Sequence, residues 1–436
     1  MNFSEQRIAR CDPNWKRQRI KHHISQLYGG GTPATTETSF WTNGTIPWVS
    51  SKDMKVARLY ETEDYITPEA VDRSASNTVE AGAILMVVRS GILKHSIPVA
   101  INTVKVAINQ DIKALVLSES LDTEFFYYWI TGQQKDLLLE WGQLGATVDS
   151  LNVEILRNTV IPLPEKSHQR LVVSYLDRET ARIDGLIEKK GRFIELLKEK
   201  RAAVITHAVT KGIDAGVPMK NSGVFWIGKH PQEWSVCKLN LRYTVELGKM
   251  LDEKKIAGVH LTPYLRNRDV QWGSINTTDL PEMDIHPSEV SRYTLKRGDL
   301  LVCEGGDVGR SAIWAGDEDI YAYQKALHRL RVRDRSKDDA EFLLYCLSAA
   351  KLCGAFEERE AKSTISHLTA EAFRTYLFPF PPLQEQKRIV EFLNVSVSKI
   401  DRLIATTNRS IELLKEKRSA LITAAVTGKI DVRNAA

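Results

Sequence analysis

The sequence predicts an α/β protein in which two similar α/β domains are joined by two long antiparallel helices, as an internal repeat with pseudo-twofold symmetry. The main observation is that residues 147–214 and 364–431 align without a gap at an offset of 217 residues, with 30 of 68 positions identical. A repeat of this length indicates duplicated domains, because solenoids and propellers repeat every ~20–50 residues. Such a protein is expected to bind a target that itself has approximate twofold symmetry.

Residues 1–160 are expected to form the first α/β domain. Short apolar runs at 84–88 and 99–107 predict buried strands, because aliphatic and β-branched residues in runs of this kind favour strands. The longer stretch 121–139, which contains FFYYWI, predicts a buried helix. Glycine-rich turns such as GGGTP leave places where a ligand could approach the backbone.

Residues 161–217 and 378–436 are expected to form the two long helices. Each segment opens with prolines, which fit loops and first helical turns and end any preceding helix. A heptad pattern then continues from Leu176 in one copy and from Leu393 in the other. The helices could pack on their own domains, or they could pair with each other as a molecular spacer, which is the interpretation that we favour.

Residues 218–377 are expected to form a second α/β domain built like the first. Runs at 300–304 and 320–332 predict strands, and 340–356 predicts a buried helix. Four arginines alternate along HRLRVRDR (328–335), which places them on one face of a strand and suits phosphates or guanine edges. A solvated strand face, balanced by neighbouring aspartates, is an equally open interpretation.

The composition argues for a protein of the reducing cytoplasm. No run approaches the roughly 18–20 apolar residues that a membrane span needs. The N-terminal residues MNFSEQRIAR lack the apolar core of a signal peptide, and the five cysteines show no paired spacing. The net charge of +5 is a weak indication of an anionic partner, and the excess comes from the helical segments.

Sequence motifs of catalysis are missing, so we expect no catalytic residue, no metal site and no cofactor on this chain. The sequence has no phosphate-binding loop, HExxH or GxSxG motif, and no NPPY or DPPY tetrapeptide. The alternative of an enzyme of unrecognised type would use carboxylates such as Asp299, Glu304 and Asp307.

Several phrases resemble those of the specificity (S) subunit of type I restriction–modification systems, and the resemblance covers essentially the whole chain. The paired segments containing IPLPEKSHQR, FPFPPLQEQK and IELLKEKR look like the central and C-terminal conserved regions of that family. IPWVSSKDM and VVRSGILKHSIPVA in the first half, and PYLRNRDVQWG, GDLLVCEGGDVGRSAIW and YQKALHRLRV in the second, look like phrases of its target-recognition domains. The first half departs by beginning with CDPNW instead of the longer entry before Trp234, so its N-terminal contact surface is expected to be reduced.

The resemblance implies a non-catalytic reader of double-stranded DNA. Residues 1–160 and 218–377 would each recognise one half of a split target, and the spacer helices at 161–217 and 378–436 would set the gap. Two modification (methyltransferase) subunits would dock on the helices, and restriction (translocase and nuclease) subunits would join through them. S-adenosylmethionine, ATP and Mg²⁺ are expected on those partners. The alternative from another class is a coiled-coil scaffold that binds protein partners only.

Two sets of side chains are predicted to make these contacts. Basic residues in or beside the target-recognition phrases are expected to bind DNA as phosphate clamps or base-edge donors, namely Lys52, Arg89, Lys94, Arg266, Arg268, Arg310, Lys325 and Arg329. Apolar residues outside the heptad seam are expected to form open surfaces that the modification subunits cover, namely Ile205, Ala208, Val209, Ile422, Ala425 and Val426.

Overall fold

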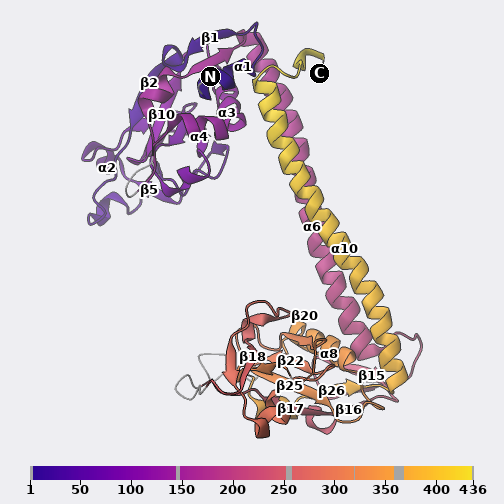
Figure 1. Ribbon diagram of the computed structural model, residues 1–436. Helices are drawn as coiled ribbons and strands as arrows, with labels where there is room; N and C mark the ends of the chain where they lie inside the picture. The colour runs from indigo at the N-terminus through magenta and orange to yellow at the C-terminus, as the bar shows by residue number, and fades with distance from the viewer. Residues whose placement is uncertain (1–2, 144–147, 252–257, 319, 358–367, 435–436) are drawn as a thin grey trace. The chain divides into compact units, whose positions relative to one another are not determined.

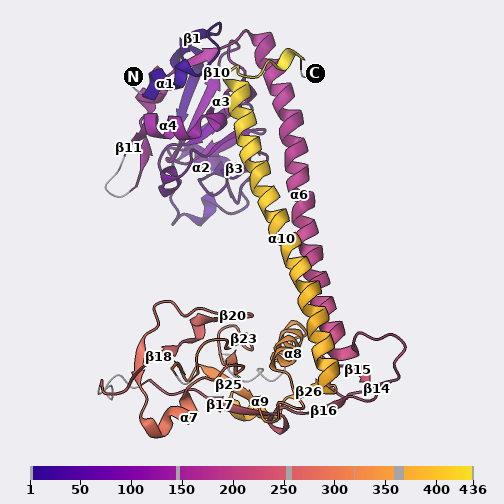
Figure 2. The same cartoon turned by 45° about the vertical axis from the view of Figure 1, so that its right-hand side comes forward.

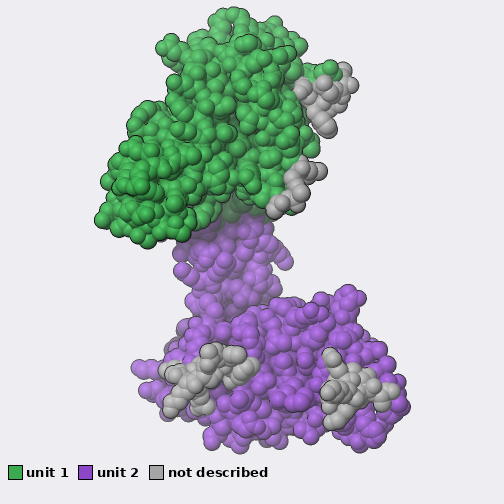
Figure 3. All heavy atoms as spheres, turned by 90° about the vertical axis from the view of Figure 1, so that its left-hand side faces the viewer, with its two compact units in different colours: residues 1–190, 409–436 green, residues 191–408 purple. Residues whose placement is uncertain are grey.

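The computed structural model describes residues 3–143, 148–251, 258–318, 320–357 and 368–434. The chain divides into two compact units, which Figure 3 shows in different colours. Unit 1 comprises Met1–Lys190 and Arg409–Ala436, and unit 2 comprises Gly191–Asn408. Each unit contains one globular α/β domain and one part of each of two long helices (Figure 1).

The domain of unit 1 is built around two sheets. Its helices are α1 (Phe3–Ala9), α2 (Pro68–Asp72), α3 (Thr123–Gly132), α4 (Gln134–Trp141) and α5 (Val153–Asn158), and its strands are β1 (Lys16–Arg19), β2 (Ile24–Gly29), β3 (Ile46–Val49), β4 (Arg58–Leu59), β5 (Asp64–Ile66), β6 (Thr78–Val79), β7 (Ile84–Val87), β8 (Val99–Asn102), β9 (Val106–Ile108), β10 (Ile112–Leu117), β11 (Gly142–Gln143), β12 (Ser150–Leu151) and β13 (Val160–Leu163). One sheet has the order β2-β10-β7-β8-β4 and the other β5-β3-β9-β6.

The domain of unit 2 has the same plan. Its helices are α7 (Val290–Tyr293), α8 (Ala340–Leu352) and α9 (Ala370–Thr375), and its strands are β14 (Met219–Asn221), β15 (Lys229–Pro231), β16 (Ser235–Lys238), β17 (Tyr243–Leu247), β18 (Leu261–Leu265), β19 (Val270–Gln271), β20 (Ser274–Ile275), β21 (Glu282–Asp284), β22 (Leu300–Cys303), β23 (Ser311–Ile313), β24 (Ala322–Tyr323), β25 (Leu327–Val332) and β26 (Leu377–Phe380). Its main sheets have the orders β17-β25-β22-β23 and β21-β18-β24.

Strand pairing confirms that the two domains are copies of one fold. The order β2-β10-β7-β8 in unit 1 corresponds strand by strand to β17-β25-β22-β23 in unit 2, and all these pairs are antiparallel. In the second sheet of each domain, one strand has an antiparallel and a parallel neighbour. That strand is β3 between β5 and β9 in unit 1, and β18 between β21 and β24 in unit 2.

The long helices are α6 (Lys166–Lys211) and α10 (Leu383–Val426), which lie side by side in Figures 1 and 2. In unit 1, Arg418 of α10 pairs with Asp184 of α6 at 2.9 Å. In unit 2, Arg201 of α6 pairs with Asp401 of α10 at 2.9 Å. Each unit thus joins the start of one helix to the end of the other, so the helices are antiparallel, as predicted.

Each helical part also packs into the core of its own domain. In unit 1, Leu176 of α6 and Val426 of α10 belong to one buried cluster with Trp129 of α3. In unit 2, Val209 of α6 and Leu393 of α10 share a cluster with α8. The sequence left open whether the helices pack on their own domains or pair with each other. The structure shows both kinds of contact for each helix.

Three predicted elements are each divided in two. The run 99–107 forms β8 and β9, because the buried side chain of Asn102 donates to the backbone carbonyls of Glu80 and Val104 and holds a turn between them. The stretch 121–139 forms α3 and α4, which are separated at Gln133. The run 320–332 forms β24 and β25. Apolar periodicity alone does not mark such interruptions.

Candidate nucleic-acid interface

A tight turn with an exposed basic residue follows the central strand of the second sheet in each domain. In unit 1 the turn after β3 is closed by Asp53, whose Oδ2 accepts from the N–H of Ser50 at 2.8 Å and from its hydroxyl at 2.9 Å. The Asp53 carboxylate also accepts from the N–H of Glu63. Lys52 lies within this turn with 64% of its side chain exposed, 3.8 Å from Glu63.

The equivalent turn in unit 2 follows β18 and is closed by Asp269. The Asp269 carboxylate accepts from the N–H of Arg266 at 2.8 Å and from its guanidinium at 2.7 and 2.9 Å. Burial raises the pKa of Asp269, but the hydrogen bonds from Arg266 more than offset this effect, so its pKa lies below the usual range. Arg268, which corresponds to Lys52, has 74% of its side chain exposed.

Arg310 holds the turn in unit 2 through hydrogen bonds to Asn267. Its Nη2 donates to the backbone carbonyl of Asn267 at 2.9 Å and to the side-chain Oδ1 of the same residue at 2.8 Å. The amide of Asn267 in turn donates to the carbonyl of Gly305 at 3.1 Å. Lys325 is exposed in the neighbouring connection, where the N–H of Gln324 donates to the carbonyl of Leu265. The structure therefore brings together four predicted residues, Arg266, Arg268, Arg310 and Lys325.

In unit 1, Lys52 lines a hollow of about 640 Å³. Residues of the 90–99 segment and of helix α3 form the other walls of this hollow, and Lys55 also lines it. Lys94 is exposed in this segment and Arg89 is exposed immediately before it, where Ser90 caps a short 3-10 helix that ends at Lys94. Lys52 and Lys55 line the hollow, whereas Arg89 and Lys94 lie beside its lining residues without lining it. The sequence did not single out Lys55.

The interpretation of the alternating arginines as an anion-binding face, one of two left open by the sequence, is wrong for Arg329 and Arg331 on β25. Arg329 is buried, with 2% of its surface exposed. Its guanidinium pairs with Glu246 and donates to the carbonyls of Arg292 and Thr294 at 3.0 and 2.9 Å. Arg331 pairs with Asp299 at 2.6 Å. These contacts engage both terminal nitrogens of Arg329, while its buried Nε has no hydrogen-bond partner among the described residues. Arg329 and Arg331 therefore form no open row along β25, and the exposed Arg333 and Arg335 lie beyond the end of that strand.

The predicted apolar docking surfaces must also be corrected. All six residues are at most 2% exposed, because α6 and α10 bury them against their own domains: Ile205, Ala208, Val209, Ile422, Ala425 and Val426. Other apolar side chains of the helices are exposed at positions that the repeat makes equivalent. These are Leu186 (37%) with Leu403 (42%), and Leu196 (54%) with Leu413 (48%).

Two of the carboxylates that the enzyme alternative would use, Asp299 and Asp307, have partners within the second domain. Asp299 is buried in its ion pair with Arg331, and Asp307 accepts from the indole N–H of Trp272 at 3.1 Å. Within the described ranges, no three histidine, cysteine or carboxylate side chains could hold a metal ion together. No helix in the described segments has the length and apolarity that a membrane crossing requires.

The chain is thus a duplicated α/β protein with an exposed basic residue in the equivalent turn of each copy. Comparison with known families makes this specific. The family model for the type I restriction modification DNA specificity domain matches residues 14–195 and again 231–416. The chain therefore belongs to the family of type I restriction–modification specificity subunits.

Known proteins that resemble the chain agree with this assignment. The MjaIX specificity subunit of Methanocaldococcus jannaschii is 24% identical over 99% of this chain and 96% of its own length. The EcoR124I/EcoR124II specificity subunit of Escherichia coli is 36% identical, and the match spans 41% of this chain and 44% of that protein.

Two solved structures share the fold. A chain of a type I R-M system superimposes with a TM-score of 0.73 at 17% identity, covering 96% of this chain and 99% of that one. The HsdS subunit of Thermoanaerobacter tengcongensis superimposes with a TM-score of 0.57 at 16% identity, covering 96% of this chain and 98% of that one.

Proposed function

We propose that this chain is the non-catalytic specificity subunit of a type I restriction–modification complex and that each domain reads one half of a bipartite target in double-stranded DNA. The observation that carries the proposal is that one turn recurs on one scaffold with different side chains. Ser50 and Lys52 in the first domain correspond to Arg266 and Arg268 in the second. Equal scaffolds with unequal side chains suit two half-sites of different sequence.

The chemistry of the turns supports contacts with DNA. Arg268 and Lys52 extend from turns whose backbones are held by buried or half-buried aspartates, so only the side chains must be ordered on binding. An exposed guanidinium can bind guanine O6 and N7 or a phosphate, and an ammonium group can do the same with less directional preference. In this proposal Arg266 and Arg310 hold the turn, and Arg268 and Lys325 contact DNA.

The helices are proposed to set the gap between half-sites and to dock two modification subunits. The equivalent exposed leucines on α6 and α10 support the docking, since a surface that occurs twice can bind two copies of one partner. S-adenosylmethionine is assigned to these partners, and ATP and Mg²⁺ to restriction subunits that join through them. Membership of the family is the reason for proposing each of these assignments.

Selection from random double-stranded DNA tests the proposal. The purified chain with its modification subunits should enrich two short sequences separated by an unspecified gap. Arg268→Ala should relax one half-site and Lys52→Ala the other, at about 1–3 kcal/mol each. The chain alone, incubated with DNA and S-adenosylmethionine, should transfer no methyl group. Enrichment of no DNA sequence would favour the scaffold alternative, and methyl transfer by the chain alone would favour an enzyme.

A further inference from the structure

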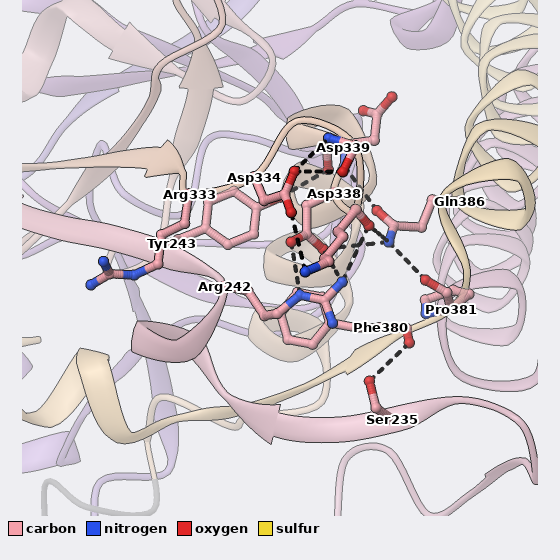
Figure 4. A network of polar contacts seen from close by, with 12 residues as sticks. Ser235, Arg242, Tyr243, Arg333, Asp334, Asp338, Asp339, Phe380, Pro381 and Gln386 are labelled. Atoms are coloured by element: carbon pink, nitrogen blue, oxygen red, sulfur yellow. Dashed lines mark hydrogen bonds and ion pairs between the residues drawn. The ribbon is translucent and has the colours of Figure 1, made fainter.

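Gln386 is a buried polar side chain, on the fourth residue of α10, that joins this helix to the second domain. Its Oε1 accepts from the N–H of Asp339 at 2.9 Å, and its Nε2 donates to the carbonyls of Lys337 at 3.0 Å and Pro381 at 2.8 Å (Figure 4). Asp339 caps the N-terminus of α8, accepting from the N–H groups of the first turn. One amide therefore joins the starts of two helices.

Gln169 makes the same contacts in the first domain. It is the fourth residue of α6 and is 1% exposed. Its Oε1 accepts from the N–H of Asp122, the N-cap of α3, at 2.8 Å. Its Nε2 donates to the carbonyls of Ser120 at 3.1 Å and Pro164 at 3.0 Å. Each partner occupies the position that the 217-residue offset predicts.

A second polar contact lies about two turns further along each long helix. In unit 2 the hydroxyl of Tyr345 donates to Oδ1 of Asn394 at 2.6 Å, and Asn394 donates to Glu341 at 2.9 Å. In unit 1 the hydroxyl of Tyr128 donates to Asp177 at 2.7 Å. Burial raises the pKa of both tyrosines, to about 12 for Tyr345, so both hydroxyls keep the proton that they donate.

The polar contacts differ in kind from the apolar packing around them. Burial of apolar surface is non-directional, so it resists separation of helix and domain more strongly than rotation. Hydrogen bonds are directional: they prefer donor angles above about 150° and weaken steeply below about 120°. A buried glutamine with both ends engaged resists rotation, because any turn that breaks its bonds leaves buried groups unsatisfied.

We propose that Gln169 with Tyr128, and Gln386 with Tyr345, are positioning residues that hold each recognition domain at one angle on its helices. Through that angle they would restrict the protein to one gap length between half-sites. This inference rests on the proposed function. Successive base pairs are rotated by roughly 35°, since the duplex has 10–10.5 base pairs per turn. A domain that can rotate by such an angle on its helix would accept a gap one base pair longer or shorter.

We call Gln169 with Tyr128 the clamp of unit 1, and Gln386 with Tyr345 the clamp of unit 2. The clamp of unit 2 has one feature that the clamp of unit 1 lacks. Asp338 is buried, pairs with Arg242 at 2.8 Å and lies 3.5 Å from Nε2 of Gln386. The equivalent residue in the first domain is Leu121, which is also buried. Gln386→Glu would therefore place a carboxylate beside Asp338, whereas Gln169→Glu would not. These two substitutions form a matched pair, and the first should release its domain more than the second.

The first test measures the clamp without DNA. Hydrogen exchange of the Asp339 amide, read in the full chain with its modification subunits, should accelerate by about tenfold or more in Gln386→Leu, because Oε1 no longer accepts from that amide. Lys387→Gln changes the next residue, which is exposed, and should leave this exchange rate unchanged. Unchanged exchange in Gln386→Leu would overturn the clamp.

The second test measures the gap. Selection from DNA in which both half-sites are fixed and the gap varies should return one preferred length for the wild type. In Gln386→Leu the preference over gaps one base pair longer or shorter should fall by about tenfold, the factor that follows from losing about one buried hydrogen bond to the backbone. Both half-site sequences should be retained, which a general loss of folding would not allow.

Tyr345→Phe replaces Gln386→Leu in this test if Gln386→Leu does not fold, because it removes only one hydroxyl. It should also widen the range of gap lengths that the protein accepts. The proposal would be overturned if Gln386→Leu or Tyr345→Phe binds both half-sites and still prefers one gap length as strongly as the wild type does. If the wild type selects no bipartite DNA, the proposed function fails together with the effect on the gap. Accelerated exchange at Asp339 would in that case still support the clamp itself.

Discussion

Replacing Arg310 by alanine should weaken recognition of one half-site, although in the proposed arrangement Arg310 does not touch DNA. Its guanidinium holds Asn267 through two hydrogen bonds of 2.9 and 2.8 Å, and Asn267 lies beside the exposed Arg268. Loss of these bonds should let the turn after β18 move, so Arg268 would lose its fixed position. The effect should be confined to the half-site that the second domain reads.

The magnitude follows from the contacts. A hydrogen bond from a charged donor contributes about 1.5–3 kcal/mol, which gives an upper range of about 3–6 kcal/mol for two. Among the described residues the buried Nε of Arg310 has no partner, so its removal relieves a desolvation cost of about 1–3 kcal/mol. The net loss should be about 2 kcal/mol, or roughly 30-fold in affinity if it falls entirely on the turn.

A double-mutant cycle provides the assay. Affinities of the wild type, Arg310→Ala, Arg268→Ala and the double variant are measured by salt-controlled gel shift on the cognate duplex and on duplexes with one half-site altered. Because Arg310 acts through the turn that carries Arg268, the two losses should be less than additive by about 1 kcal/mol or more. Lys52→Ala is the matched control and should affect the other half-site only.

Three results would refute this reasoning. Unchanged affinity in Arg310→Ala would mean that the turn needs no support from below. Strictly additive losses would mean that Arg310 acts independently of Arg268. An equal loss at both half-sites would mean that the substitution damages the protein generally.

Three further predictions concern the spacer, the partner surface and pH. Seven residues inserted after Lys190 keep the heptad phase and add about 10 Å of helix, so the selected gap should lengthen by up to about three base pairs with both half-sites retained; an unchanged gap would exclude the helices as a ruler. Leu196→Glu and Leu413→Glu should each remove one of two modification subunits, which native mass spectrometry would show as a one-to-one complex. Burial lowers the pKa of His328 to about 4, so the unfolded chain binds more protons than the folded chain between pH ~6.5 and ~4. The free energy of unfolding should therefore fall by roughly 3 kcal/mol as the pH drops through this window. Urea titrations at each pH measure this fall, and it should be smaller in His328→Gln.

The structure also shows which sequence signals were sufficient. The repeat predicted a duplication, because two segments with 30 of 68 identical positions are expected to fold alike. The heptads predicted the long helices, because a 3.5-residue period determines which face is buried. The exposure of Lys52 and Arg268 agrees with their place in turns between strands. Gln169 and Gln386 occupy equivalent positions of the repeat, which the sequence shows. The residues next to them in sequence do not reveal that these glutamine side chains are buried.

What only the tertiary structure decided is which side chains are left for a ligand. The alternation around Arg329 correctly indicates a strand, yet its exposure depends on Glu246 and Thr294, which are distant in the chain and meet it only in the folded sheet. Likewise, the apolar face that contains Val209 and Val426 is covered by the domain to which each helical part belongs. Periodicity determines which residues share a face, because it is a property of the local backbone. What covers that face is determined by contacts between residues far apart in sequence, and these exist only once the chain has folded.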